Sequence, residues 1–371
     1  MERCDVLVVG GGPAGSSCAS ELRRAGLDVV VADRSSFPRD KPCAGWVTPA
    51  ALTALRFDAD DYRRGGRVLQ PIMGFRTGRI GGPELSTRYG EVVSFGILRR
   101  EFDAYLLARS GARLRLGRPV RKLRRAPAGW TLDGELFAPV VVGAGGHFCP
   151  VARQLAGELR EQPVVVVAQE AEVRLDGASR DDCSVRPDTP ELFFCGDRRG
   201  YGWCVRKGDW LNVGFGRQGE RTLPSQVEAF LAFLRARMKL PAGVPSAMKG
   251  HAYLLYDTSR RPLSGERFLL AGDAAGLAYA RSGEGIRPAI ESGLLAARTL
   301  VAAGGRYGAD ALAPYEQAVR SRLGPRRGNG HLPDGIATAL TRWVLASGWW
   351  TRKLVVEGSF LRSSQPALAS V

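Results

Sequence analysis

A glycine motif close to the N-terminus constrains the fold of this chain more than any other feature. The motif, G-x-G-x-x-G, consists of Gly10, Gly12 and Gly15. It follows a short apolar run at 5–9 and precedes a helix-favouring segment at 16–25. The first glycine permits a tight turn, the second lets the backbone approach a pyrophosphate, and the third lets helix and strand pack closely. This order predicts a Rossmann-type fold that holds a phosphate at a helix N-terminus.

An acidic residue completes the motif. Asp33 follows a second apolar run at 27–32, where its carboxylate can accept hydrogen bonds from a ribose. The motif suits a flavin nucleotide as well as a nicotinamide nucleotide. It therefore indicates a class of cofactor but no reaction.

The chain is strongly basic, with a formal net charge of +16 over 371 residues. Three interpretations are open: a nucleic-acid partner, an anionic membrane surface, or a general basic bias. The basic residues are spread out and no nucleic-acid-binding module is visible, so we expect no nucleic-acid partner. Aromatic residues near the C-terminus leave peripheral contact with an anionic membrane open.

Cysteine and histidine usage bears on metal binding and on compartment. Seven cysteines and three histidines form no C-x-x-C pair and no ligand cluster, so we expect no metal site. An odd number of cysteines without a secretory signal favours reduced thiols and a cytoplasmic location. A content of 44% hydrophobic residues is typical of a globular protein with one large domain or two interleaved domains.

A second pair of glycine sites decides between the cofactors. An apolar run at 268–271 ends in Gly272-Asp273, and Gly283-Glu284-Gly285-Ile286 opens a helix that runs to about residue 302. This G-D-A-A-G and G-E-G-I pairing resembles the flavin site of the para-hydroxybenzoate-hydroxylase-fold flavoproteins. The resemblance implies that Asp273 holds the ribityl chain of FAD. It also implies that the Gly285–Ile286 backbone stabilises negative charge on the reduced flavin.

Two further segments resemble the same family. The helix that begins at Arg99 has the R-x-x-F-D pattern, which places Arg99 near the flavin. A hairpin follows, in which Val120 stands where the family contacts adenine, and it feeds a strand that ends at Gly143. The family pattern G-A-D-G has Gly145 in place of its aspartate, which disfavours simple hydroxylase behaviour.

The segment "RDKPCAGW" resembles the K-P-C-G-G motif of the geranylgeranyl reductase branch, with Ala44 in place of the first glycine. In that branch the cysteine lies close to the flavin. Cys43 is therefore a candidate catalytic residue with three interpretations: a proton donor, a wall of the pocket, or a small packing residue.

The segment "GYGWCVRK" points to the substrate. Tyr201, Trp203 and Val205 alternate, so they share one face of a strand. They resemble the Y-x-W-x-F-P substrate-pocket motif of geranylgeranyl reductases, which implies that Tyr201 and Trp203 line an apolar pocket over the flavin. The alternative is an ordinary aromatic core face. The W-x-W-x-I-P signature of the flavin-dependent halogenases, which share this fold, is not evident.

The resemblance implies cofactor contacts along much of the chain. These residues are Gly10, Gly12, Pro13, Ala14, Gly15, Asp33, Arg34, Ala44, Arg99, Val120, Gly143, Gly272, Asp273, Gly283, Gly285 and Ile286.

The expected fold class is α/β, or α+β overall. We expect a discontinuous Rossmann-type FAD-binding domain at 1–55, 97–155 and 262–325, and an inserted antiparallel-sheet substrate domain at 56–96 and 156–261. C-terminal helices at 326–371 would cap the substrate domain. Their tryptophans and basic residues also suit an amphipathic segment at a membrane surface; these residues are Arg342, Trp343, Trp349, Trp350, Arg352 and Lys353.

The functional prediction is an FAD-dependent oxidoreductase that reduces carbon–carbon double bonds of an isoprenoid or other apolar, lipid-like substrate. NAD(P)H is the expected reductant, and it would bind transiently because no second dinucleotide motif is evident. Two alternatives stay open: a monooxygenase of the same fold, and a flavin- or lipid-binding protein without turnover. The expected location is the cytoplasm, with peripheral contact at the inner face of the membrane left open.

Overall fold

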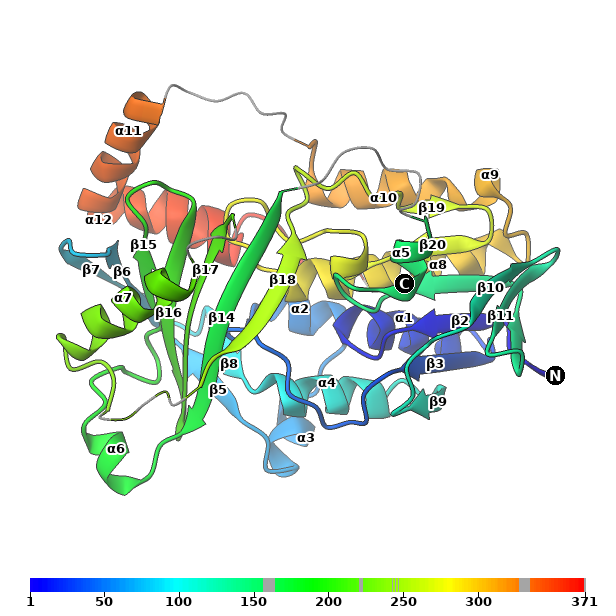
Figure 1. Cartoon of the computed structure of the whole chain (residues 1–371), viewed down its shortest axis with the longest axis horizontal. Helices are drawn as coiled ribbons and strands as arrows, with labels where there is room; N and C mark the ends of the chain where they lie inside the picture. Colours follow the sequence, from blue (N-terminus) through cyan, green and yellow to red (C-terminus); the bar gives the residue numbers. More distant parts are fainter. Residues whose placement is uncertain are drawn as a thin grey trace.

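A largely parallel sheet forms one side of the molecule (Figure 1). The computed structural model describes residues 1–155, 164–219, 223–241, 243, 245, 247–326 and 334–369. In spatial order the strands are β19 (Ser264–Gly265), β20 (Phe268–Leu270), β13 (Val140–Gly143), β2 (Val6–Val9), β3 (Val29–Asp33) and β9 (Arg113–Leu116). Every pair except β19–β20 is parallel. Their valine-rich runs are buried on both faces, as a helix-covered parallel sheet requires.

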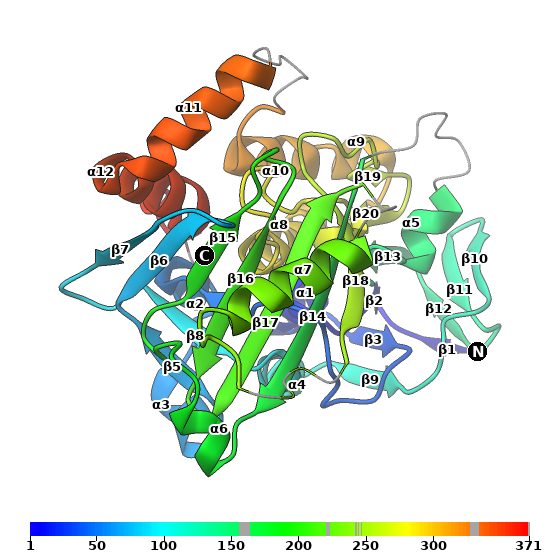
Figure 2. The same ribbon diagram turned by 60° about the vertical axis from the view of Figure 1, so that its left-hand side comes forward.

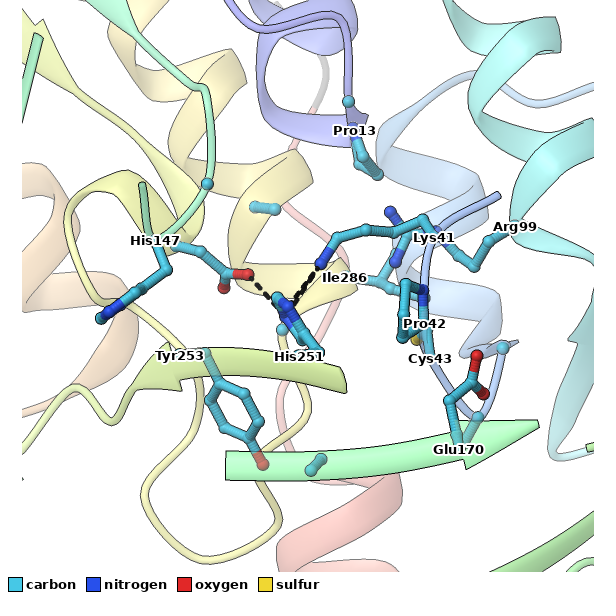
Figure 3. Close-up of a pocket in the computed structure, with 18 of the residues that line it drawn as sticks. Pro13, Lys41, Pro42, Cys43, Arg99, His147, Glu170, His251, Tyr253 and Ile286 are labelled. Atoms are coloured by element: carbon cyan, nitrogen blue, oxygen red, sulfur yellow. Dashed lines mark hydrogen bonds and ion pairs between the residues drawn. The ribbon is translucent and has the colours of Figure 1, made fainter. Parts of the chain in front are cut away.

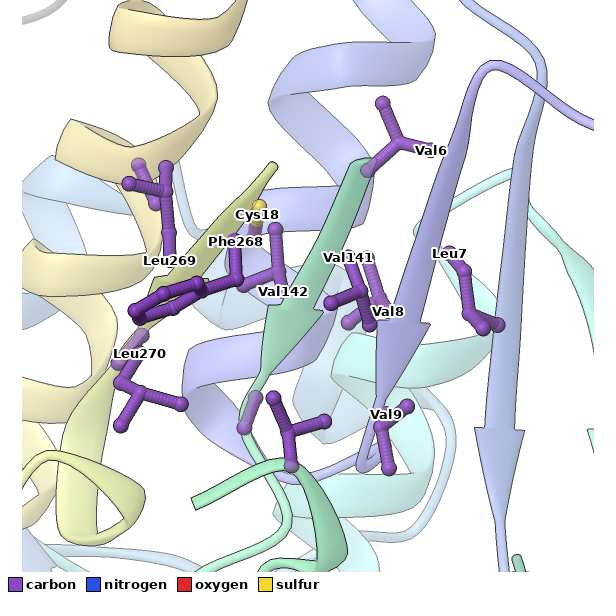
Figure 4. Close-up of a cluster of buried hydrophobic side chains, with 14 of the residues drawn as sticks. Val6, Leu7, Val8, Val9, Cys18, Val141, Val142, Phe268, Leu269 and Leu270 are labelled. Carbon is purple, nitrogen blue, oxygen red and sulfur yellow. The ribbon is translucent and has the colours of Figure 1, made fainter. Parts of the chain in front are cut away.

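Two long helices pack against each other beside this sheet, α1 (Pro13–Arg24) and α8 (Ile286–Ala303). Gly293 lies where they meet, and a Cβ there would lie 2.2 Å from the carbonyl oxygen of Ala14. A glycine inside α8 therefore lets the start of α1 approach closely. Valines of β2 and β13, Cys18 of α1 and the residues of β20 share one buried apolar cluster (Figure 4).

A second, mostly antiparallel sheet forms the other side (Figures 1 and 2). In spatial order its strands are β18 (Lys249–Leu254), β14 (Val165–Arg174), β17 (Trp210–Gln218), β16 (Gly200–Lys207), β15 (Glu191–Phe194), β6 (Gly74–Arg79) and β7 (Glu84–Arg88). Side chains alternate between its faces: Cys204 and Phe215 pack under α7 (Leu223–Arg235), while Trp203 and Val205 face inward. The predicted alternation of Trp203 and Val205 is confirmed.

Smaller elements join and flank the two sheets. One side sheet has the order β1 (Glu2–Arg3), β12 (Leu136–Ala138), β11 (Gly129–Leu132) and β10 (Leu123–Ala126), and another has β4 (Trp46–Val47), β8 (Ser94–Ile97) and β5 (Leu69–Ile72). Besides α1, α7 and α8, the helices before residue 326 are α2 (Pro49–Ala54), α3 (Ala59–Arg64), α4 (Arg99–Ala108), α5 (Pro150–Leu155), α6 (Gly177–Asp181), η2 (Gly272–Ala274), α9 (Ala309–Leu312) and α10 (Pro314–Leu323) in the described part of the chain.

The C-terminal helices are α11 (Asp334–Ala346), α12 (Gly348–Trp350) and the π-helical segment η3 (Thr351–Leu361). Val356 and Phe360 of η3 are buried with Trp46, Phe75 and Trp203, so η3 covers part of the inward face of the antiparallel sheet. The tail beyond η3 is held to the other side, because Arg287 of α8 donates to the carbonyl oxygens of residues 365 and 366. Within the described ranges, no helix combines the length and the apolarity needed to cross a membrane.

The predicted fold class is confirmed: a Rossmann-type unit stands beside an inserted, mostly antiparallel sheet, and helices follow at the C-terminus. Residues 156–163 and 327–333, which adjoin the expected domain junctions, lie outside the described residues.

Candidate active site

A cavity of about 370 Å³ lies where the carboxyl ends of the parallel strands meet the inward face of the antiparallel sheet. Open α/β sheets bind their ligands at this edge. Most of the residues expected from the sequence line it. They are Gly12, Pro13, Ala14, Asp33, Arg34, Cys43, Ala44, Arg99, Tyr201, Trp203, Asp273, Gly283, Gly285 and Ile286.

The other expected residues lie behind the lining or apart from it. Gly10 has φ +116°, and a Cβ there would lie 2.4 Å from the Ala144 carbonyl oxygen. A Cβ at Gly15 would lie 1.8 Å from the Gly10 carbonyl oxygen, so both glycines shape the turn. Gly143 ends β13 and Gly272, with φ +59°, begins η2. Val120 is partly buried against the main apolar cluster, outside the lining.

The start of α1 is suited to an anion. Its N-cap, Gly12, supplies no capping side chain, so the first N–H groups of the helix are available to a phosphate. A Cβ at Gly12 would lie 3.4 Å from Arg39 Nη2, so the bare backbone lies beside a guanidinium group. The Asp33 carboxylate accepts from the Gly11 N–H at 2.7 Å and from the Ser35 N–H at 2.9 Å. This end fits a pyrophosphate with an adjoining ribose.

Lys41, His251 and Asp273 form a polar cluster that lines the cavity, and Figure 3 shows Lys41 and His251 pointing toward each other. Lys41 Nζ lies 2.9 Å from each ring nitrogen of His251, and His251 Nε2 lies 3.6 Å from Asp273 Oδ2. Burial lowers the pKa of Lys41 to about 8, although the charge of Asp273 opposes this shift. Burial acts to raise the pKa of Asp273, but the hydrogen bond and charge of His251 and the charge of Lys41 outweigh it and leave that pKa below its usual value. Asp273 is thus an acceptor suited to ribityl hydroxyls.

The loop before α8 closes the next part of the cavity. Gly283 has φ +68°, and a Cβ there would lie 2.4 Å from the Tyr253 hydroxyl. The Tyr201 hydroxyl donates to the Ser282 carbonyl oxygen at 2.6 Å, which ties β16 to this loop. The Glu284 carboxylate accepts from the Arg287 N–H at 2.7 Å, and burial raises the pKa of Glu284 to about 7. The Glu284 side chain therefore binds one of the first N–H groups of α8.

Arg99 is fixed at the base of the cavity. Its guanidinium group donates to both carboxylate oxygens of Asp103, at 2.9 and 2.8 Å, one turn further along α4. Arg39 Nη2 also pairs with Asp103, at 3.2 Å. One buried carboxylate thus positions two cations that line the cavity.

The antiparallel sheet supplies an aromatic floor. Tyr201 and Trp203 have ring centroids 5.8 Å apart, and Phe360 of η3 lies 5.5 Å from the Tyr201 ring. Trp203 lies over Gly214 of β17, where a Cβ would come within 2.2 Å of the indole ring. Trp203 belongs to a buried apolar cluster and also lines the cavity, and its role toward a substrate stays a prediction.

Cys43 is half-buried in the loop between the two sheets. Its carbonyl oxygen accepts from Asn212 Nδ2 at 3.2 Å, and the next carbonyl, of Ala44, accepts from Lys207 Nζ at 3.1 Å. Gly45 then takes φ +68°, with Lys207 Nζ 2.7 Å from where its Cβ would be. Side chains of the antiparallel sheet therefore fix the backbone of this loop.

Sequence reasoning missed several polar residues of the site. Glu170, Asn212, His251 and Tyr253 come from strands of the antiparallel sheet and face the cavity or its lining. Lys207 is also part of this region, because it is fully buried and pairs with Glu172. A signal existed: Glu170 and Glu172 alternate with apolar residues in the run "VVVVAQEAEV", so both had to share one face of a strand.

The residues present fit FAD. Among the described residues, the buried Arg39 Nη1 and His147 Nδ1 have no hydrogen-bond partner, and both side chains line the cavity. An uncapped helix start, several cations and two carboxylates therefore border one continuous space, as a dinucleotide with a long polar middle requires.

Known proteins match both the motif region and the whole fold. A family model described as an FAD binding domain matches residues 3–58. The crystal structure of a geranylgeranyl bacteriochlorophyll reductase-like protein from Thermoplasma acidophilum has a TM-score of 0.74 and 22% identity, over 100% of this chain and 94% of that chain. A digeranylgeranylglycerophospholipid reductase from Methanothrix thermoacetophila is 28% identical over 87% of this chain and 84% of its own length.

A relative with higher sequence identity shows which family this chain belongs to. A menaquinone reductase from Mycobacterium tuberculosis is 31% identical over 327 residues, which are 81% of this chain and 77% of that protein. This chain belongs to the geranylgeranyl reductase family of FAD-dependent oxidoreductases. As a family member it is an FAD-dependent oxidoreductase, as the sequence predicted, and the reductase interpretation is favoured over the monooxygenase and the non-catalytic ones.

Proposed function

We propose that this geranylgeranyl reductase family member reduces carbon–carbon double bonds in a polyprenyl chain. One observation carries the proposal: the nucleotide-binding end and the aromatic floor border a single cavity, with Cys43 between them. The relatives named above act, by their names, on menaquinone and on a digeranylgeranyl phospholipid. Both compounds carry isoprenoid chains, which an aromatic floor is suited to hold.

The proposed cofactor contacts follow the geometry of the cavity. Reduced FAD supplies the hydride when it is bound. The start of α1 and Gly12 would hold the pyrophosphate, Asp33 the ribose, and Asp273 the ribityl chain. Ile286 at the start of α8 and Arg99 at the base would border the flavin ring. The charge of Arg99 and the dipole of α8 would favour an electron-rich ring.

The proposed substrate contacts lie on the opposite wall. Tyr201 and Trp203 would hold the alkene flat against the floor and exclude water from it. Cys43 stands at the junction of the two ends, and its thiol would contact either the reacting carbons or the cofactor edge.

NAD(P)H is the proposed reductant. The chain has one G-x-G-x-x-G motif in a strand–turn–helix setting, at residues 10–15, which FAD would occupy. NAD(P)H would therefore visit the site transiently, deliver its hydride and leave before the lipid enters.

We further propose that the protein is divided into an FAD-binding unit and a substrate unit. We also propose that it binds at the inner face of the cytoplasmic membrane. The FAD-binding unit comprises 1–55, 97–155 and 262–325, and the substrate unit comprises 56–96 and 156–261. Apolar side chains are exposed on the C-terminal helices, with Leu340 49%, Trp343 54% and Trp349 58% accessible. A net charge of +16 suits an anionic lipid surface as the partner of this patch.

Anaerobic rapid mixing tests the function. The FAD-loaded protein is reduced and mixed with a geranylgeranyl lipid while the absorbance of oxidised flavin is followed. We expect this absorbance to return with the unsaturated lipid and not with its fully saturated analogue. If no alkene restores the absorbance, while oxygen with an aromatic compound yields a hydroxylated product, the proposal is overturned.

A further inference from the structure

Glu170 is a buried carboxylic acid in the wall that the antiparallel sheet contributes to the cavity. It lies on β14, two residues from Ala168 on the same face, and both line the cavity. Only 5% of Glu170 is exposed. Figure 3 shows its carboxyl group pointing from the strand toward Pro42 and Cys43. A buried acid in such a place costs folding free energy, so it calls for a chemical reason.

One amide links Glu170 to the residues already proposed to hold the substrate. Asn212 Nδ2 donates to the Glu170 carboxylate and, at 3.2 Å, to the Cys43 carbonyl oxygen. The other end of the amide, Oδ1, accepts from Trp203 Nε1 at 2.7 Å. The carboxyl group is thereby fixed between the floor of the cavity and the Cys43 loop.

The buried cation whose charge acts on Glu170 pairs with a different acid. Lys207 Nζ pairs with Glu172, and it also donates to the carbonyl oxygens of Ala44 and Ile97. Lys249, which is opposite Glu170 in the strand register, pairs with Asp40 at 2.7 Å. Among the described residues, no cation forms an ion pair with Glu170. Its carboxylate is held by an amide instead, which leaves its protonated form accessible.

The charges around Glu170 favour a proton near neutral pH. Burial raises the pKa of Glu170 to about 7, and the charge of Glu172 adds to this shift. The hydrogen bond from Asn212, the charge of Lys207 and the backbone of Cys43 oppose it. Lys41 and His251 also line the cavity, where they contact each other at 2.9 Å. General acids work best when their pKa lies near the working pH.

We propose that Glu170 is the acid that protonates the substrate alkene, an inference that rests on the proposed reductase function. The π bond is replaced by two C–H bonds. One carbon takes the hydride that the reduced cofactor supplies, and its neighbour takes the Glu170 proton. Glu170 is left as a carboxylate, which Asn212 stabilises until water returns a proton to it. Cys43 then acts as a wall of the pocket and not as the acid.

The test uses FAD-loaded, reduced protein mixed anaerobically with a geranylgeranyl lipid at several pH values. In the unaltered protein, we expect the rate of flavin oxidation to fall as pH rises through about 7, because the acid loses its proton. Glu170→Gln should slow this step by roughly 100-fold or more and abolish its pH dependence. Glu170→Asp should restore a pH-dependent rate in part. Glu228→Gln, which removes the same charge from the exposed face of α7, should match the unaltered protein.

A second readout does not depend on turnover. A raised pKa stabilises the fold below the ordinary glutamate pKa of 4.5, and this stability is lost as pH rises through about 7. The thermal midpoint of the FAD-loaded protein should therefore fall more between pH 5 and pH 8 than that of Glu170→Gln.

The outcomes separate this inference from the proposed function. If no alkene reoxidises the reduced flavin of the unaltered protein, the proposed function fails, and Glu170 has no substrate to protonate. If it reduces the alkene while Glu170→Gln keeps its rate and pH profile, the function stands and the role of Glu170 is overturned. That role is likewise overturned if Cys43→Ser, and not Glu170→Gln, removes the pH dependence.

Discussion

Trp203 and Gly214 show how a missing side chain shapes the substrate wall. A Cβ on Gly214 would lie 2.2 Å from the nearest atom of the indole ring, which is too close for both to fit. The ring keeps this position through the hydrogen bond to Asn212 at 2.7 Å. A methyl group at residue 214 must therefore move the indole ring, the strand, or both.

We predict that Gly214→Ala lowers substrate turnover at least tenfold and the free energy of unfolding by about 1–3 kcal/mol, because it overpacks the wall. Turnover of a polyprenyl lipid and urea unfolding measure the two effects. Gly216→Ala is the matched control on the same strand, since the atom nearest to its Cβ would be Ala168 Cβ at 3.3 Å, and the indole ring would be 3.6 Å away. Equal turnover in the two variants would contradict the proposed position of the substrate.

Asp273 is the carboxylate proposed to hold the ribityl chain of FAD. Its carboxylate is negatively charged at neutral pH and accepts in the middle of the cavity. We predict that Asp273→Asn weakens FAD binding roughly 10–100-fold, because a hydrogen bond to a charged group contributes about 1.5–3 kcal/mol. Fluorescence titration of FAD gives the dissociation constant, with the exposed Asp310→Asn as control. An unchanged constant in Asp273→Asn would remove Asp273 from the cofactor site.

At the scale of elements, the contact between α1 and α8 aligns the two helix starts. Gly293 permits it, because a Cβ there would lie 2.2 Å from the Ala14 carbonyl oxygen. Both helices begin at the cavity, so a change in their packing reaches the cofactor without touching it.

We predict that Gly293→Ala lowers the free energy of unfolding by about 1–3 kcal/mol and also weakens FAD binding. The control is Gly177→Ala in α6, where a Cβ would meet no atom within 4 Å. Denaturant unfolding and FAD titration of both variants make the comparison. If Gly293→Ala binds FAD as tightly as the unaltered protein, the helix contact does not position the site.

The sequence was most informative where a motif implied its own surroundings. The strand, turn and helix around Gly10–Gly15 were predictable, since each glycine has a steric reason. The alternation at 201–205 likewise predicted a shared face. Glu170 and Asn212 were not found, because their place depends on the register between β14 and β17, which pairs residues far apart in the chain. His251 was missed for the same reason, since its neighbour Lys41 lies in a distant loop.

At the scale of the whole molecule, the C-terminal helices carry an apolar patch on one side and cover the substrate wall on the other. Trp349 is 58% exposed, while Phe360 is buried against Trp46 and Trp203. Figures 1 and 2 both place α11 at the outer end of the antiparallel sheet. A lipid surface at this patch would lie next to the wall proposed to hold the lipid chain.

We predict that the protein sediments with vesicles containing phosphatidylglycerol, less so with phosphatidylcholine vesicles, and less at high salt. Replacing Trp343 and Trp349 by alanine should weaken the binding roughly tenfold or more, because both side chains are large and exposed. Val301→Ala, at another exposed apolar residue, should have no effect. Equal sedimentation of all three proteins would exclude this patch as the contact.

In the proposed function, one cavity joins FAD to a polyprenyl chain, and the chain is reduced there. The most direct measurement is the mass of the lipid recovered after anaerobic incubation of the FAD-loaded protein with NADPH and a geranylgeranyl lipid. We predict a product heavier by two hydrogens for each reduced double bond, and no product from the saturated lipid. A lipid recovered unchanged, or one that gains an oxygen only when air is admitted, would contradict this function.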